Sequence, residues 1–255
     1  MRQFGLIGYP LSHSFSKGFF AEKFLKENIV DAQYENYPIA TIQAFNSLWA
    51  NENLEGLNVT IPYKKDVIAF IQHPSTVVSQ INACNCIRKF NNELYGYNTD
   101  VLGFEKSLLP LLKPNHTKAL ILGTGGAAAA VQWVLQKLSI QYQLVSRNNQ
   151  AVASIFNAPV LSYQALNEDI LQEHKLIINT SPIGMYPNVQ EAPLIPYEAI
   201  GSGHYLYDLV YNPAETLFLA KGKEKGAAIK NGLDMLHLQA LESWAIWNAA
   251  IPPIQ

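Results

Sequence analysis

The sequence of 255 residues lacks the features that mark membrane, secreted and nucleic-acid-binding proteins. No apolar run approaches the roughly 18 residues of a membrane-spanning helix, and the opening residues Met1-Arg2-Gln3-Phe4 do not begin a signal peptide. A formal net charge of −2 and the absence of a basic block argue against binding to nucleic acid. These absences predict a cytoplasmic protein with neither a membrane nor a nucleic-acid partner.

Cysteine is nearly absent and histidine is scattered, which argues against disulfides and metal sites. Cys84 and Cys86 are the only two cysteines, and the Cys-Asn-Cys spacing fits neither a zinc pair nor a disulfide framework. We expect both to be buried thiols on one face of a strand. The six histidines form no cluster with metal-ligand spacing, so we expect no metal, and each histidine is expected to be a surface or capping residue.

Segments typical of strands alternate with segments typical of helices along the chain. The strand pattern occurs at residues 4–8, 33–37, 56–60, 93–97, 119–122, 143–145, 176–179, 205–210 and 227–230. The helix pattern occurs at residues 17–27, 41–49, 66–71, 101–111, 127–138 and 234–248. Because the alternation continues on both sides of Pro110 and Pro114, we predict two α/β units with a cleft between them. The last helix is apolar at Leu238, Leu241 and Ala245 and is long enough to return to the first unit.

A glycine turn joins the strand at 119–122 to the helix at 127–138. Gly123 allows a sharp turn off the strand, Gly125 allows backbone to approach a diphosphate closely, and Ala128 is small enough for helix and strand to pack. The exposed N–H groups at the helix start would face the anion. The pattern predicts a dinucleotide site in a Rossmann-like, doubly wound parallel sheet. A glycine-bearing turn that holds no ligand is the alternative.

The next strand indicates which dinucleotide is bound. In an NAD site a carboxylate at the end of this strand accepts a hydrogen bond from the ribose hydroxyl, but here the strand at 143–145 ends in Ser146-Arg147-Asn148. Arg147 can pair with a 2′-phosphate, which a carboxylate would repel. We therefore expect NADP rather than NAD, with a plain surface arginine as the alternative.

Polar residues follow the strands of the first half. Ser14 and Ser16 stand beyond the first strand, where they either cap the next helix or bind a ligand. Asn58 and Thr60 lie two apart and so share one face of a strand end. Lys64 and a later residue, Asp100, also follow strands and could share a proton network. From these residues alone, capping serines and a solvated Lys64 are the simpler interpretations.

Several motifs in order resemble the shikimate dehydrogenase family over nearly the whole chain. They are Ser12-His13-Ser14-Phe15-Ser16, Asn58-Val59-Thr60-Ile61-Pro62-Tyr63-Lys64, Ala83-Cys84-Asn85, Asn98-Thr99-Asp100, Gly123-Thr124-Gly125-Gly126-Ala127, Asn179-Thr180-Ser181-Pro182-Ile183-Gly184-Met185, Tyr207-Asp208-Leu209-Val210-Tyr211, and Gly232 with Met235, Leu236 and Gln239.

The resemblance implies NADPH-dependent reduction of 3-dehydroshikimate to shikimate in aromatic amino-acid biosynthesis, with Lys64 and Asp100 as the catalytic pair. It implies substrate contacts from Ser14, Ser16, Asn58, Thr60, Asn85, Tyr211 and Gln239. It implies cofactor contacts from Gly123, Thr124, Gly125, Gly126, Ala127, Ser146, Arg147, Thr180, Leu209, Gly232 and Met235. The expected domains are a substrate-binding catalytic domain, 1–101 rejoined by 234–255, and an NADP-binding Rossmann domain, 102–233.

The chain departs from the family pattern at a few positions. Lys17 stands where proline is usual, Phe19-Phe20 where a histidine is common, and Cys86 where threonine is usual. Residues 148–151 lack the second basic residue that often follows Arg147, so we expect a weaker preference for NADP than usual. Action on quinate and a sensor without turnover are the alternatives, although the retained Lys64 and Asp100 argue against a sensor. Monomer and homodimer are both compatible with the sequence.

Overall fold

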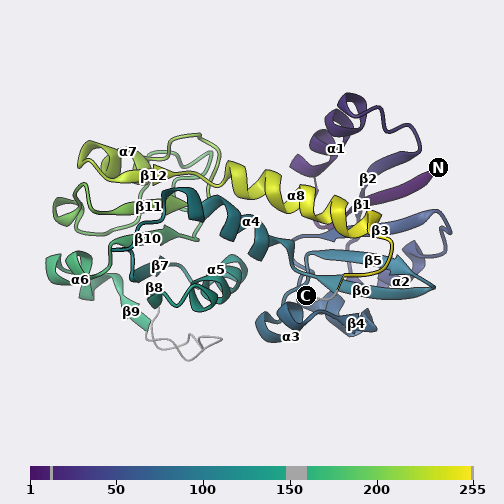
Figure 1. The fold of residues 1–255 in the computed structure, drawn as a ribbon, viewed down its shortest axis with the longest axis horizontal. Helices are drawn as coiled ribbons and strands as arrows, with labels where there is room; N and C mark the ends of the chain where they lie inside the picture. Colours follow the sequence, from purple (N-terminus) through teal and green to yellow (C-terminus); the bar gives the residue numbers. More distant parts are fainter. Residues whose placement is uncertain (12–13, 148–159, 254–255) are drawn as a thin grey trace. The chain divides into compact units, whose positions relative to one another are not determined.

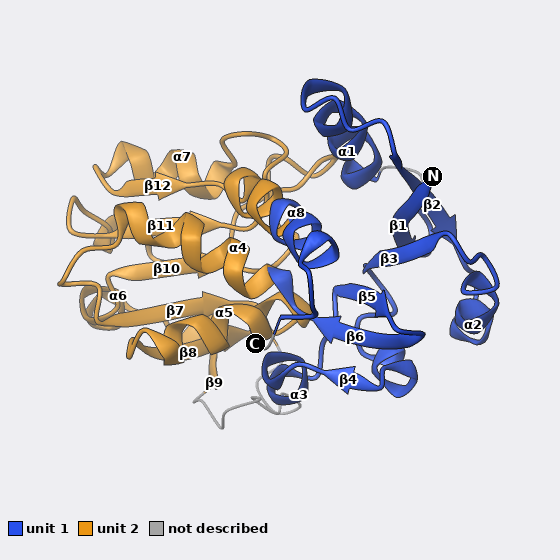
Figure 2. Ribbon diagram, turned by 45° about the vertical axis from the view of Figure 1, so that its right-hand side comes forward, with its two compact units in different colours: residues 1–99, 240–255 blue, residues 100–239 orange. Residues whose placement is uncertain are grey.

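A computed structural model describes residues 1–11, 14–147 and 160–253, which fold into two compact units (Figure 2). Unit 1 comprises residues 1–99 and 240–255, and unit 2 comprises residues 100–239. The assignment of functions to the predicted domains remains a prediction. No helix in the described part of the chain is long and apolar enough to cross a bilayer.

Unit 1 is built on a mixed six-stranded sheet in the order β2-β1-β3-β5-β6-β4 (Figure 1). Its strands are β1 (Arg2–Gly8), β2 (Ala32–Pro38), β3 (Leu54–Val59), β4 (His73–Pro74), β5 (Cys86–Phe90) and β6 (Glu93–Tyr97). β1 is parallel to both β2 and β3, whereas β5 is antiparallel to both β3 and β6. The predicted strands are confirmed with small shifts at their ends, but β4 and β5 were not predicted.

The β5–β6 hairpin nevertheless has a signal in the sequence. Its turn is Asn91-Asn92, and both residues have positive φ, 50° and 65°. Asparagine tolerates this left-handed conformation better than most residues, which is why it is common in two-residue hairpin turns. The charged residues Arg88 and Lys89 interrupt the apolar pattern that would otherwise predict the strand before this turn. Arg88 donates from Nη1 to Ile246 O at 2.9 Å, so a charged side chain occupies a buried position in the strand.

Among the helical segments of unit 1, the one predicted at 17–27 is confirmed as α1, whereas the others are shorter or more irregular than the sequence suggests. They are α1 (Phe15–Lys26), η1 (Ile42–Ala44), α2 (Phe45–Leu48), η2 (Asp66–Phe70) and α3 (Thr76–Ile81). The helix predicted at 41–49 is a 3₁₀ turn followed by a single α turn, and the segment predicted at 66–71 is a 3₁₀ helix. α3 was not predicted, although Ser75 caps it by accepting from Val78 N at 3.3 Å.

The last helix, α8 (Leu233–Asn248), contributes residues to both units, and its end packs in the core of unit 1. Trp247 stacks on Phe4 with ring centroids 4.8 Å apart and donates from Nε1 to Ile87 O at 2.9 Å. Gly56 gives the indole room, since a β-carbon there would lie 2.3 Å from Trp247 Nε1.

The buried face of α8 differs from the predicted one. Leu241 is 42% exposed and Ala245 is also exposed. The helix is turned instead so that the large indole of Trp247 is buried. The buried stripe runs through Gln239, Ala240, Ser243, Ile246 and Trp247.

Unit 2 contains a parallel six-stranded sheet in the order β12-β11-β10-β7-β8-β9. Its strands are β7 (Lys118–Leu122), β8 (Gln141–Ser146), β9 (Val160–Ser162), β10 (Leu176–Asn179), β11 (Tyr205–Asp208) and β12 (Ala228–Lys230). Two helical segments precede these strands, α4 (Thr99–Leu108) and η3 (Leu109–Leu111). The helices and 3₁₀ turns between the strands are α5 (Gly126–Lys137), η4 (Tyr163–Ala165), α6 (Glu168–Glu173), η5 (Tyr197–Ala199) and α7 (Leu217–Glu224). Counted within the unit the order is 3-2-1-4-5-6, so the predicted Rossmann-like sheet is confirmed.

Three histidines of unit 2 are structural. His116, His174 and His204 are buried, so the expected surface position is wrong for them, although all three bond to backbone. His204, for example, joins its Nε2 to Leu171 O at 3.0 Å. Burial lowers the pKa of His116 and His204, which favours the neutral imidazole at these positions.

Candidate functional site

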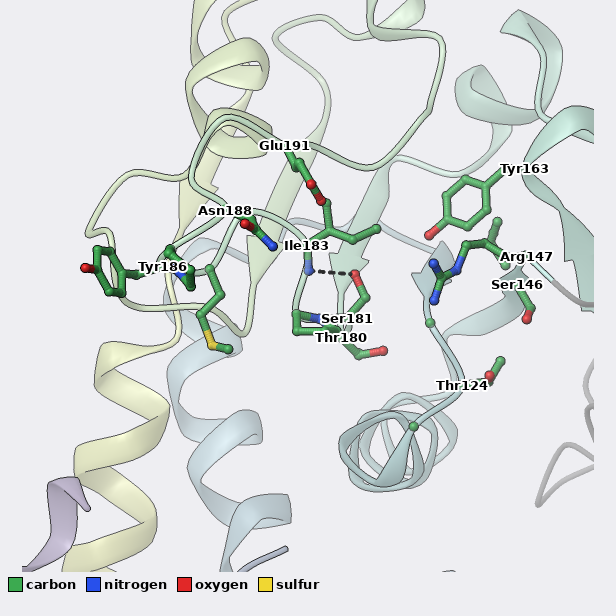
Figure 3. A pocket seen from close by; sticks show the side chains of 16 residues that line it. Thr124, Ser146, Arg147, Tyr163, Thr180, Ser181, Ile183, Tyr186, Asn188 and Glu191 are labelled. Carbon is green, nitrogen blue, oxygen red and sulfur yellow. Dashed lines mark hydrogen bonds between the residues drawn. The ribbon is translucent and has the colours of Figure 1, made fainter. Parts of the chain in front are cut away.

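A cavity of about 480 Å³ lies in unit 2 at the carboxyl ends of β7, β8 and β10 (Figure 3). β7 and β10 are neighbours in the sheet, although they are the first and fourth strands of the unit. The sheet order therefore reverses between them, and this is the position at which open α/β sheets bind ligands. The lining includes Gly123, Thr124, Gly125, Ser146, Arg147, Tyr163, Thr180 and Ser181.

The glycine turn between β7 and α5 forms one wall of the cavity. Gly123 has φ +111°, and a β-carbon there would lie 2.9 Å from Thr180 Oγ1, so glycine is required by both backbone and space. Gly125 is the N-cap of α5 with φ −77°, and a β-carbon there would meet no protein atom within 4 Å. The fold itself does not need glycine at 125. The free space on this side of Gly125 suits a ligand that approaches the backbone at the start of a twelve-residue helix.

A cation rather than a carboxylate follows β8. Ser146 ends the strand and is buried, while Arg147 is exposed and lines the cavity. Figure 3 shows Arg147 beside Tyr163. A guanidinium at the end of the second strand fits a 2′-phosphate and does not suit a bare ribose hydroxyl. Residues 148–151, where the sequence lacks a second basic residue, lie outside the described residues, as do Ser12 and His13.

A buried carboxylate holds the loop that follows β10. Asp208 Oδ1 accepts from Asn179 Nδ2 at 2.9 Å and from Val210 N at 3.0 Å, and its Oδ2 accepts from Thr216 Oγ1 at 2.6 Å. Burial raises the pKa of Asp208 to about 6, and the hydrogen bonds from its partners oppose this rise. Asn179 Oδ1 in turn accepts from Ser181 N and Oγ at 3.1 and 2.6 Å. Asp208 thus holds Asn179, and Asn179 in turn holds Ser181 in the wall of the cavity.

The other predicted cofactor residues are distributed around the same end of unit 2. Leu209 and Gly232 follow β11 and β12, and a β-carbon on Gly232 would lie 2.1 Å from Leu209 O. Met235 is buried on α8. As the structure describes the cavity, its lining contains Gly123, Thr124, Gly125, Ser146, Arg147 and Thr180 but not Gly126, Ala127, Leu209, Gly232 or Met235.

A buried polar cluster in unit 1 contains two of the predicted substrate residues. Asn58 Nδ2 donates to Asn85 O at 3.2 Å and to Ser243 Oγ at 2.8 Å. Asn85 Oδ1 accepts from Thr99 N at 2.7 Å, and Tyr34 OH donates to Asn58 Oδ1 at 2.9 Å. The cluster joins β2, the end of β3, the loop before β5, the start of α4 and α8. It fixes the orientation of both amide side chains.

Ser14 immediately precedes α1, and Ser16 lies in the first turn of this helix. Ser14 is the N-cap residue of α1, but its side chain makes no capping hydrogen bond. Its Oγ is buried and has no hydrogen-bond partner among the described residues, which leaves it able to bind a ligand. Burial raises the pKa of the Tyr34 hydroxyl, and the neighbouring Ser16 hydroxyl opposes part of this rise. The capping interpretation is therefore wrong for Ser14.

Thr60 and Lys64 lie in the segment that follows β3. A β-carbon on Gly8 would lie only 2.5 Å from the methyl carbon of Thr60, so glycine at this position leaves room for the threonine side chain. Lys64 O accepts from Cys84 N at 2.7 Å, which ties the half-buried Lys64 to the segment leading into Asn85. Burial raises the pKa of the Cys84 thiol to about 12, and the nearby Lys64 charge opposes the rise.

The other residues singled out in the sequence lie partly in unit 1 and partly in unit 2. Cys84 and Cys86 are free and buried, as predicted, although Cys84 precedes β5 rather than lying in it. Asp100, in the first turn of α4, belongs to unit 2, as do Tyr211 and Gln239. The Lys64–Asp100 pair therefore draws one residue from each unit, and it remains a prediction.

Sequence reasoning missed Ser243 and Tyr34. Both bond to Asn58, but they lie 185 and 24 residues from it in the chain. A serine on the buried stripe of α8 was the available signal for the first, because a buried hydroxyl requires a partner. Because Leu238, Leu241 and Ala245 predicted a different buried face for the helix, the sequence did not identify Ser243 as a buried residue.

Substitution of Ser243 by alanine tests the cluster. The change removes the acceptor of the 2.8 Å bond from Asn58 Nδ2 at a fully buried position. We expect the free energy of unfolding to fall by about 1–3 kcal/mol, measured by chemical denaturation. Ser79→Ala, an exposed helical serine in the same unit, is the matched control and should have little effect. Equal stability of the two variants would contradict a structural role for the cluster.

A Rossmann sheet with a glycine turn, a cavity at its switch point and an arginine after the second strand defines a dinucleotide-binding α/β protein. Residues 6–87 match the family described as the shikimate dehydrogenase substrate binding domain. This match, together with relatives that align over nearly the whole chain, shows that the chain belongs to the shikimate dehydrogenase family.

Relatives and solved structures match nearly the whole chain. The chain is 34% identical to "Shikimate dehydrogenase (NADP(+))" of Carboxydothermus hydrogenoformans, over 98% of this chain and 93% of that protein. It is 32% identical to the protein of the same name from Aquifex aeolicus, over 98% and 92%. The crystal structure of the Aquifex aeolicus shikimate dehydrogenase superposes with a TM-score of 0.86 at 31% identity, covering 99% and 94% of the chains. That of the Thermus thermophilus enzyme in complex with NADP(H) and shikimate superposes with a TM-score of 0.85 at 27% identity, covering 99% and 95%.

Proposed function

We propose that this protein is an NADP-dependent shikimate dehydrogenase that reversibly reduces 3-dehydroshikimate to shikimate in aromatic amino-acid biosynthesis. The observation that carries the proposal is the relatedness to NADP-dependent shikimate dehydrogenases over 98% of the chain, through both units. The cavity of unit 2 and the polar cluster of unit 1 supply a place for each reactant.

The residues of unit 2 fit NADP. The open side of Gly125 admits a diphosphate at the start of α5, and Arg147 is placed to pair with a 2′-phosphate. Thr124, Ser146 and Thr180 add hydroxyl groups to the wall. The other expected cofactor contacts are Gly123, Gly126, Ala127, Leu209, Gly232 and Met235. When bound, NADPH supplies the hydride that reduces the substrate carbonyl.

The substrate is a small carboxylate with several hydroxyls, and unit 1 offers matching groups. The Ser14 hydroxyl, which has no hydrogen-bond partner among the residues that the structure describes, and the fixed amides of Asn58 and Asn85 can bind such groups. We assign the same role to Ser16, Thr60, Tyr211 and Gln239. Fixed donors and acceptors cost little ordering when the substrate binds, which favours one orientation of the reacting carbonyl.

In this proposal Lys64 transfers the proton of the reaction, and Asp100 orients Lys64. As the carbonyl carbon is reduced, its oxygen gains negative charge and needs a proton. The Lys64 ammonium donates that proton and accepts it again in the reverse direction, while Asp100 orients the ammonium. The half-buried position of Lys64, with its backbone tied to the segment before Asn85, places its side chain on a supported loop.

The two units take different roles in this proposal. Residues 1–101 with 234–255 form the substrate-binding catalytic domain, and residues 102–233 form the NADP-binding domain. These boundaries lie within six residues of the division between unit 1 and unit 2, at 99/100 and 239/240. We place the enzyme in the cytoplasm, where NADPH and the substrate are available, as a monomer or homodimer.

Initial rates with shikimate and with quinate, each with NADP and NAD, test the proposal. We expect turnover to be fastest with shikimate and NADP. Faster turnover of quinate would make the protein a quinate dehydrogenase. Absence of turnover with all four combinations, in protein that binds both NADP and shikimate in calorimetry, would make it a sensor.

Gly125→Ala separates the binding role of the glycine turn from its structural role. Because φ is −77° and no protein atom lies near the new methyl group, we expect the stability to change by no more than about 0.5 kcal/mol. The methyl group enters the space proposed for the diphosphate, so the Kd for NADP should rise roughly tenfold or more in a fluorescence titration. Gly123→Ala should instead destabilise the fold. Unchanged NADP binding by Gly125→Ala would remove the diphosphate from this position.

A further inference from the structure

Tyr163 occupies a position next to Arg147 that the register of the sheet dictates. β9 pairs with β8 in parallel, with Ser162 opposite Ser146. The residues that follow this pair are Arg147 and Tyr163. They therefore lie side by side at the carboxyl ends of β8 and β9. Both line the cavity, and Figure 3 shows the phenol ring beside the arginine side chain.

The local structure holds Tyr163 in place. Ser162 caps the 3₁₀ turn η4 by accepting from Ala165 N at 3.2 Å, and Tyr163 O accepts from Leu166 N at 3.3 Å. The Tyr163 ring packs against the buried core of unit 2, which includes Leu171 and Ile195. The apolar part of the side chain is therefore anchored while its hydroxyl end reaches the cavity, as is common for tyrosine at binding sites.

The charge balance of the cavity leaves a role for a neutral donor. Arg147 is the one basic side chain, and Glu191 the one acidic side chain, among the sixteen lining residues that the structure describes. A phosphate monoester presents three strong acceptor oxygens, and one planar guanidinium can engage two of them. Burial raises the pKa of the Tyr163 hydroxyl, and the Arg147 charge only partly opposes the rise, so the hydroxyl keeps its proton at neutral pH.

We propose that Tyr163 is a cofactor-specificity residue, whose hydroxyl donates a hydrogen bond to the 2′-phosphate of NADP beside Arg147. The inference rests on the proposed function, since it assigns a further residue to the NADP site. A tyrosine hydroxyl has no comparable acceptor in NAD, which carries a ribose hydroxyl at this position. Tyr163 would therefore favour NADP without adding a second positive charge.

Binding of two adenosine nucleotides to Tyr163→Phe tests this role without turnover. Adenosine 2′,5′-bisphosphate and 5′-AMP differ only in the 2′-phosphate, and calorimetry gives a Kd for each. We expect the variant to bind the bisphosphate about 10- to 100-fold more weakly, because a hydrogen bond to a charged acceptor is lost. Its Kd for 5′-AMP should change by no more than about twofold. In steady state, KM should rise for NADP and stay constant for NAD.

Tyr197→Phe is the matched control. Tyr197 packs against the same core of unit 2, its hydroxyl donates to Pro193 O at 2.9 Å, and it does not line the cavity as described. Its replacement should leave both nucleotide affinities unchanged. Equal affinities of wild type and Tyr163→Phe for the bisphosphate would overturn the inference, and so would equal losses for the two nucleotides. Failure of the enzyme to oxidise shikimate would refute the proposed function. The nucleotide affinities of Tyr163→Phe could still be interpreted, because they are measured without turnover.

Discussion

Replacing Lys64 with alanine is expected to lower kcat for shikimate oxidation by roughly 10²–10⁴-fold, the usual effect of removing a positioned proton-transfer group. The KM for shikimate should change much less, because Asn58 and Asn85, the substrate residues proposed for unit 1, are held by contacts that do not use the Lys64 side chain. Asn58 and Asn85 keep their bonds to Ser243 and Thr99 in the variant. Steady-state kinetics at saturating NADP separates the two parameters.

Lys65→Ala is the control for Lys64→Ala. Lys65 is the next residue, carries the same charge and is exposed, so its loss alters the local charge without touching the proposed proton path. It should retain nearly full activity. A near-normal kcat for Lys64→Ala would remove Lys64 from the chemistry, and an equal loss in both variants would indicate a general effect of charge.

Arg147→Ala is expected to raise the KM for NADP by roughly 100-fold while changing the KM for NAD by no more than about threefold. The guanidinium lines the cavity at the end of β8, where a fork of donors can bind a phosphate through two charge-assisted hydrogen bonds. NAD offers only a hydroxyl at that point and loses little. Initial rates over a range of each cofactor give both values.

The control for Arg147→Ala is a cation of unit 2 away from the cavity. Lys137, at the end of α5, pairs with Glu105 at 2.8 Å and does not belong to the described lining. Lys137→Ala should leave both cofactor constants unchanged, because an exposed ion pair contributes little. Equal increases in KM for NADP and NAD in Arg147→Ala would show that the arginine acts on the shared part of the two cofactors.

The parts of the fold that sequence predicted well are those defined by local patterns. The strand, glycine turn and helix at 118–137 follow from apolar residues and glycine spacing alone, and the structure places β7 and α5 there. β5 escaped because Arg88 and Lys89 break its apolar pattern. Arg88 is nevertheless buried, because it bonds to Ile246 O and Ala249 O at the end of α8, far along the chain. Lys89 lies over the ring of Trp49, 40 residues earlier. The buried face of α8 was misjudged because the packing of Trp247 on Phe4, not the position of its leucines, sets the helix rotation.

The candidate site divides in the same way. Gly123, Gly125 and Arg147 could be found from the sequence because each acts at a known offset from one strand. Ser243 and Tyr163 could not, because their roles follow from neighbours in space. Ser243 meets Asn58 across 185 residues, and Tyr163 lies beside Arg147 only through the pairing of β8 with β9. Periodicity carries no signal for contacts of this kind.

The contribution of α8 to unit 1 sets an order of events during synthesis. Unit 2 is continuous from 100 to 239, so all of its strands are synthesised before Ser243 and Trp247. Until then Asn58 lacks its 2.8 Å acceptor, Arg88 lacks the Ile246 carbonyl, and the space beside Gly56 lacks the Trp247 indole. The first 99 residues thus emerge first but complete their core last. In a nascent chain, unit 2 should therefore become protease-resistant before unit 1 does.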